Sequence, residues 1–121
     1  MTTTANQYLN ELQEYLKDKV DTITLHINTE KIASLMNEAD FAIVTPSVTV
    51  NEVIFMGLPF IAIQTADNQN EIAQYLEEQE FQVLRSYGSN KLKVAINVIT
   101  NEKNYNSTLI NIDSVLTGKL K

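Results

Sequence analysis

The chain has 121 residues, of which 44% are apolar, so it can form one domain with a core of its own. Its net charge of −6 and its single arginine, Arg85, argue against a nucleic-acid partner. With no cysteine and only one histidine, His26, it lacks the residues for a thiolate nucleophile or a multi-histidine metal site, and we expect no cofactor. No apolar run is long enough to span a membrane, so we expect no membrane insertion and a cytoplasmic location.

The N-terminal third of the chain predicts a helix, a strand and a second helix. In residues 4–17, apolar side chains recur at three- and four-residue spacing, which is typical of an amphipathic helix. Residues 22–27 alternate between apolar and polar side chains and therefore predict a strand, and residues 30–38 predict a short helix. A doubly wound domain normally begins with a strand, so we expect a fragment that lacks its first strand. A homodimer could cover the sheet edge that this loss would leave open.

The rest of the chain is organised around residues 40–69, which predict a strand, a helix and a second strand. The short apolar runs 41–44 and 60–63 are typical of strands that are covered on both faces. Apolar residues between them cover much of a helix circumference, and Gly57 should end that helix. Two parallel strands joined by a helix form a right-handed unit, with its chemistry at the carboxyl ends of the strands.

Residues 46–52 and 65–69 follow these strand ends, and we expect the site there. Ser47 is a good N-cap for the central helix, and Thr49 with Glu52 offers a second cap with capping-box spacing. Backbone N–H groups at the start of a helix suit a phosphate.

The C-terminal part predicts a helix at residues 70–80, a strand at 81–84, a helix at 90–101 and, after a polar connection at 103–107, a last helix at 109–120. The predicted fold of residues 1–121 is therefore a single α/β domain with a three-layer, Rossmann-like arrangement. Its parallel sheet should consist of four strands, near residues 22–27, 40–45, 60–64 and 81–84.

Short motifs around the central unit also resemble those of a known family. The chain has AD before the first strand, TVNE in the helix, GLP after the helix and ADNQ after the second strand, at residues 39–40, 49–52, 57–59 and 66–69. In this order they resemble the C-terminal domain of UDP-sugar hydrolases of the pseudaminic-acid pathway. Those enzymes have the GT-B architecture and are similar to the lipid-II N-acetylglucosaminyltransferase. The resemblance implies metal-free hydrolysis of a UDP-linked diacetamido-trideoxy sugar in bacterial surface-glycan or flagellin sugar biosynthesis.

The resemblance also implies roles for individual residues. The loop before the central helix would bind the diphosphate, and the helix glutamate would bind the ribose. A pair at the end of the predicted strand 22–27 would contact the uracil, and an amide pair would bind the sugar. The nucleotide-binding candidates are Ser47, Val48, Thr49, Glu52, Ile27 and Asn28, and the sugar-binding candidates are Asn68 and Gln69. From spacing alone, Glu52 would only reciprocate a Thr49 cap.

Three functions stay open at this point. The chain could be the UDP-sugar-binding half of a hydrolase, completed by a missing N-terminal domain or a separate subunit. It could be the donor-binding half of a UDP-sugar glycosyltransferase, which would use the same pocket. It could also be a non-catalytic binding or assembly module. In the resembling hydrolases the catalytic histidine lies in the N-terminal domain, and His26 falls within a predicted strand, so we assign no catalytic residue and expect the chain alone to be inactive.

Overall fold

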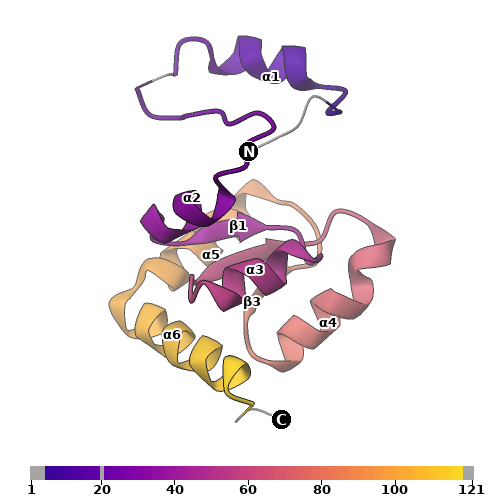
Figure 1. Cartoon of the computed structure of the whole chain (residues 1–121). Helices are drawn as coiled ribbons and strands as arrows, with labels where there is room; N and C mark the ends of the chain where they lie inside the picture. The colour runs from indigo at the N-terminus through magenta and orange to yellow at the C-terminus, as the bar shows by residue number, and fades with distance from the viewer. Residues whose placement is uncertain (1–4, 20, 119–121) are drawn as a thin grey trace. The chain divides into compact units, whose positions relative to one another are not determined.

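The structure is a computed structural model that describes residues 5–19 and 21–118 (Figure 1). The chain forms two compact units, Met1–Ile32 and Ala33–Lys121, each with its own internal contacts. No helix in the described ranges is both long and apolar enough to cross a membrane.

The N-terminal unit contains the helix α1 (Leu9–Leu16), which is shorter than the predicted helix 4–17; residue 4 lies outside the described residues. The strand predicted at residues 22–27 is wrong, because only Ile27 forms an isolated β-bridge there. The backbone N–H groups of Thr22 and Ile23 both donate to the Lys19 carbonyl, at 3.1 and 2.9 Å, and hold this segment in a turn. Alternation alone does not make a strand, because a strand also needs a partner for its ladder.

The C-terminal unit contains a parallel sheet with the strand order β1-β2-β3. Its strands are β1 (Ala42–Val44), β2 (Phe60–Ile63) and β3 (Gln82–Leu84), and both pairs are parallel. Three of the four predicted strands and their common direction are therefore confirmed. The described sheet has three strands instead of four because residues 22–27 do not join it as a strand.

The helices of this unit lie before, between and after the strands, and most match the prediction. They are α2 (Ile32–Glu38), α3 (Thr49–Phe55), the short 3₁₀ helix η1 (Asp67–Gln69), α4 (Asn70–Glu78), α5 (Ser89–Thr100) and α6 (Glu102–Leu116). This element order and the parallel sheet are compatible with a Rossmann-like α/β fold.

The core lies around β2, whose four residues are all buried. Ile61 and Ile63 pack with Ala95 and Ile99 of α5 on one face of the sheet. By the alternation of a strand, Phe60 and Ala62 point to the other face, and both are fully buried. Figure 1 shows α3 and α5 on opposite sides of the strands. The central strand β2 is therefore covered on both faces, as predicted. The outer strand β1 is not, because its middle residue Ile43 is 46% exposed.

The last helix corrects the predicted polar connection at residues 103–107, which is helical. Asn101 caps α6, because its side-chain oxygen accepts the N–H groups of Lys103 and Asn104 at 3.1 and 3.4 Å. The Tyr105 hydroxyl then donates to the Asp40 carbonyl at 2.7 Å, which ties this turn to the start of β1. The polar run is the solvent side of the first turns of α6, and a cap with one long-range contact is enough to extend the helix through it.

Gly57 ends α3 as predicted, and its role can be tested directly. Its φ angle is +71°, and the N–H groups of Gly57 and Leu58 donate to the carbonyls of Ile54 and Val53, which is a Schellman ending. A Cβ atom at Gly57 would meet nothing within 4 Å, so only the backbone conformation opposes a side chain. We expect Gly57→Ala to lower the free energy of unfolding by about 1 kcal/mol, measured by urea denaturation.

Gly57→Asn provides the matched control, because asparagine adopts this left-handed conformation more readily than alanine. We expect Gly57→Asn to be the more stable of the two variants, although asparagine is the poorer helix former. An alanine variant that is as stable as the wild type would contradict the assigned backbone role.

Candidate functional site

Three loops leave the sheet at the same edge. In the parallel register Val44 lies beside Ala62, and Ile63 lies beside Leu84, so β1, β2 and β3 end close together. The loops that follow these ends are residues 45–48, 64–69 and 85–88. In open parallel sheets ligands bind outside this carboxyl edge, so the predicted position of the site is consistent with the topology.

The first of these loops begins α3 in a different way from the one predicted. Val48 occupies the N-cap position with a helical backbone, and no side chain caps the helix. The Ser47 hydroxyl lies 3.2 Å from the Thr45 hydroxyl, and the Ser47 N–H donates to the Thr45 carbonyl at 2.8 Å. The predicted Ser47 cap and the capping box between Thr49 and Glu52 are therefore both wrong. The backbone N–H groups of Val50 and Asn51 donate instead to the carbonyls of Ser47 and Val48. These backbone bonds satisfy donors at the helix start that a capping side chain would otherwise accept from.

The start of α3 leaves groups of two kinds available to a ligand. The backbone N–H groups of Val48 and Thr49 donate to no acceptor among the described residues, and both residues are exposed. Nor does the exposed Glu52 carboxylate make a hydrogen bond or ion pair with any residue in that part of the chain. Because Glu52 does not take part in a cap, a capping box does not explain the carboxylate at this position. Two N–H donors suit an anion, and a carboxylate suits a pair of hydroxyl donors.

The second loop is held in shape by its own side chains. The Thr65 N–H and hydroxyl donate to Gln69 Oε1 at 2.8 and 3.4 Å, and Gln64 Nε2 donates to the Ala66 carbonyl at 3.1 Å. Gln69 therefore uses its amide oxygen to fix the loop and keeps only its amide nitrogen for a ligand. Asn68 is exposed in η1, and within the described ranges its side chain makes no hydrogen bond. Of the predicted sugar-binding pair, Asn68 has the more available side chain.

Arg85 is a residue of this edge that the sequence reasoning did not assign to the site. It follows β3 directly, and its Nη1 donates to Gln64 Oε1 at 2.9 Å. Its Nε also lies 3.2 Å from Glu77 Oε1 of α4. The only available signal was that the single arginine of the chain stands immediately after the last predicted strand.

The remaining nucleotide-binding candidates, Ile27 and Asn28, lie in the N-terminal unit. Ile27 forms the isolated β-bridge, and Asn28 has a left-handed backbone with φ +51°. Their place beside a uracil ring stays a prediction. His26 lies in the same unit and is partly exposed. Across the described parts of both units, no group of three or more histidine, cysteine or acidic residues is placed to hold a metal ion.

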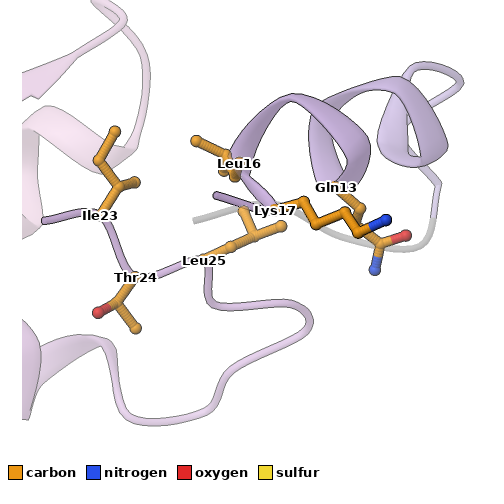
Figure 2. Close-up of a pocket in the computed structure, with 6 residues that line it drawn as sticks. All are labelled: Gln13, Leu16, Lys17, Ile23, Thr24 and Leu25. Carbon is orange, nitrogen blue, oxygen red and sulfur yellow. The ribbon is translucent and has the colours of Figure 1, made fainter. Parts of the chain in front are cut away.

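Among the described residues, surface hollows also lie away from the predicted site, and two of them are well defined. The one in the N-terminal unit, of about 310 Å³, is drawn in Figure 2 and is lined by Gln13 and Leu16 of α1, by Lys17 directly after this helix, and by Ile23, Thr24 and Leu25. Its lining combines three aliphatic with three polar or charged side chains and contains no acid–base pair. The other hollow, of about 450 Å³, lies at the start of β3 against α5 and α6, with Phe81, Val98 and Asn111 in its wall. Neither is lined by a predicted site residue.

Comparison with known proteins yields two relatives, and no protein-family model matches the chain. Over 86 residues, or 71% of its length, the chain is 35% identical to the UDP-2,4-diacetamido-2,4,6-trideoxy-beta-L-altropyranose hydrolase of Campylobacter jejuni. This chain resembles part of a nucleotide-sugar hydrolase. It is also 34% identical over 67 residues, or 54% of its length, to an uncharacterized protein of Methanocaldococcus jannaschii. The matches cover 31% of the first relative and 14% of the second.

Proposed function

We propose that the chain is the UDP-sugar-binding half of a nucleotide-sugar hydrolase. The observation that carries this proposal is the 35% identity to the Campylobacter hydrolase over 71% of the chain. The substrate class we propose is the one in that relative's name, a UDP-linked diacetamido-trideoxy sugar. We assign the chain to the C-terminal half of a GT-B-type enzyme, which the parallel sheet and its element order are compatible with. In this proposal the enzyme serves pseudaminic-acid biosynthesis.

The nucleotide would lie across the first loop and the start of α3. The free N–H groups of Val48 and Thr49, with the Ser47 hydroxyl beside them, would bind the diphosphate, since a helix start favours negative charge. The Glu52 carboxylate would accept hydrogen bonds from both ribose hydroxyls, because an ionised carboxylate is an acceptor only. Ile27 and Asn28 would contact the uracil edge through their backbone.

The sugar would lie against the loop after β2. Its acetamido groups and hydroxyls contain donors and acceptors, and side-chain amides can pair with both. Asn68 offers its whole amide, whereas Gln69 offers its nitrogen, because Thr65 already donates to its oxygen. This division predicts that Asn68 contributes more to sugar recognition than Gln69 does.

The hydrolytic step needs groups that this edge does not supply. Water must attack the anomeric carbon while the bond to the UDP oxygen breaks, and a base must take the proton of the water. Glu52 is assigned to the ribose, and the described part of this edge contains no histidine. We therefore assign the base to another domain or subunit, and expect the chain to bind a UDP-sugar without hydrolysing it.

Calorimetric titration of the purified chain with UDP, ADP and inorganic pyrophosphate tests this proposal. We expect UDP to bind about tenfold or more tightly than ADP, since one or two hydrogen bonds to the uracil edge account for a difference of that size. Affinity should be modest, because half of a two-domain cleft leaves the sugar side open. Equal affinity for all three compounds would mean that the chain recognises only an anion, and the nucleotide-sugar assignment would fall.

A further inference from the structure

Arg85 joins three segments at the carboxyl edge of the sheet. From the end of β3, its Nη1 donates to Gln64 Oε1 at 2.9 Å and to the Asn70 carbonyl at 3.4 Å. Its Nε forms an ion pair with Glu77 Oε1 at 3.2 Å. Gln64 is the first residue after β2, and Asn70 is the first residue of α4. The Arg85 side chain therefore makes a hydrogen bond to each end of the loop of residues 64–70.

One internal hydrogen bond of this loop is made by Gln64, the residue whose side chain Arg85 contacts. Gln64 accepts from Arg85 through Oε1 and donates to the Ala66 carbonyl through Nε2, at 3.1 Å, so Arg85 orients the amide that supports the first turn of the loop. The Thr65 N–H then donates to Gln69 Oε1 at 2.8 Å. Loss of the guanidinium would release Gln64 and leave the loop with only its local bonds.

An arginine is needed for this arrangement. Its planar guanidinium presents several donors in a fixed fork, so it can bond an amide oxygen, a backbone carbonyl and a carboxylate together. A lysine could keep the pair with Glu77 but would present a single point charge. Because Arg85 already forms an ion pair with Glu77, we do not assign its guanidinium to binding of an anionic ligand.

We propose that Arg85 is a positioning residue that fixes the loop of residues 64–70 so that Asn68 and Gln69 present their amides to the sugar. The identity of the ligand rests on the proposed function, whereas the effect on the loop does not. This role affects the two ligands differently. Removing Arg85 lowers the affinity for a UDP-sugar, because the sugar loses its contacts with the loop. The affinity for UDP, which contacts the first loop, stays nearly unchanged.

The test uses the full chain with Arg85→Met, Arg85→Lys and the control Lys91→Met. Lys91 carries the same charge near the same strand end, and its Nζ bonds the Ser86 hydroxyl at 2.9 Å. Three quantities are measured: the Kd for UDP and for UDP-N-acetylglucosamine by calorimetry, the Tm, and the solvent-exchange rate of the Thr65 amide by NMR. Arg85→Met should raise the Kd for the UDP-sugar about five- to tenfold and that for UDP less than about twofold.

The Thr65 amide should exchange faster in Arg85→Met, and Lys91→Met should change neither binding nor exchange. Arg85→Lys should shift all readouts in the same direction as Arg85→Met, and it carries the test alone if the methionine variant does not fold. Equal weakening of UDP and UDP-sugar with unchanged Thr65 exchange would overturn the positioning role. If the wild-type chain binds neither compound, the proposed function fails, and the exchange rate decides the loop role: faster exchange upholds it, and unchanged exchange rejects it.

Discussion

Replacing Phe60 with alanine should remove much of the stability of the C-terminal unit. Phe60 is fully buried in β2, and its ring centroid lies 4.9 Å from that of Phe81. Truncating a buried phenylalanine leaves a cavity and typically costs about 3–5 kcal/mol, out of a total of about 5–15 kcal/mol for a domain. We expect the urea midpoint to fall sharply, or the variant to be unfolded at room temperature.

Phe55→Ala is the matched control for this prediction. Phe55 ends α3, and its side chain is 76% exposed, so the same truncation removes little buried surface. The change in the free energy of unfolding should stay within about 0.5 kcal/mol. Similar losses for Phe55→Ala and Phe60→Ala would contradict the placement of the core around β2.

Replacing Glu52 with alanine should have the largest effect on nucleotide affinity. In the proposed site this carboxylate accepts the ribose hydroxyls, and a hydrogen bond to a charged group contributes about 1.5–3 kcal/mol. The Kd for UDP should therefore rise roughly 10- to 100-fold, measured by calorimetry. The fold should be unaffected, because Glu52 makes no hydrogen bond or ion pair among the described residues.

Glu102→Ala controls for charge and helix position. Glu102 also lies in the first turn of a helix and is exposed, but α6 begins near the start of β1, at the opposite edge of the sheet. Both variants lose one negative charge near a helix start. We expect UDP affinity to be unchanged in Glu102→Ala, and equal effects in the two variants would show that Glu52 acts only through the net charge.

The features predicted correctly from sequence are those with local causes. The apolar run of β2 is buried on both faces, and Gly57 supplies the left-handed residue that ends α3. The run of β1 forms the predicted strand, but Ile43 in its middle is 46% exposed, so its predicted cover on both faces is wrong. The wrong predictions concern residues whose local sequence is equally compatible with two conformations or two hydrogen-bond partners. Residues 22–27 alternate as a strand does but begin in a turn held by Lys19, and Ser47 bonds Thr45 instead of capping α3.

The position of the two candidate loops could be predicted from the sequence, but the hydrogen bonds that hold them could not. Parallel strands fix which loops share an edge, and this placed residues 46–52 and 65–69 together at the carboxyl side of the sheet. The role of Arg85 depends on contacts with residues 21 and 15 positions away in the chain. No periodicity or capping rule reports such contacts, so the way in which the second loop is held became visible only in the structure.

An NMR titration of the isotope-labelled chain tests, residue by residue, the proposal that UDP binds at the start of α3. The amide signals of Val48 and Thr49, whose N–H groups are free, should shift most as UDP is added, together with that of Glu52. Inorganic phosphate should move the first two signals but not that of Glu52, because phosphate has no ribose. Shifts confined to α1 (Leu9–Leu16) or α6 (Glu102–Leu116), with the signals of Val48, Thr49 and Glu52 unmoved, would show that UDP does not bind at the start of α3.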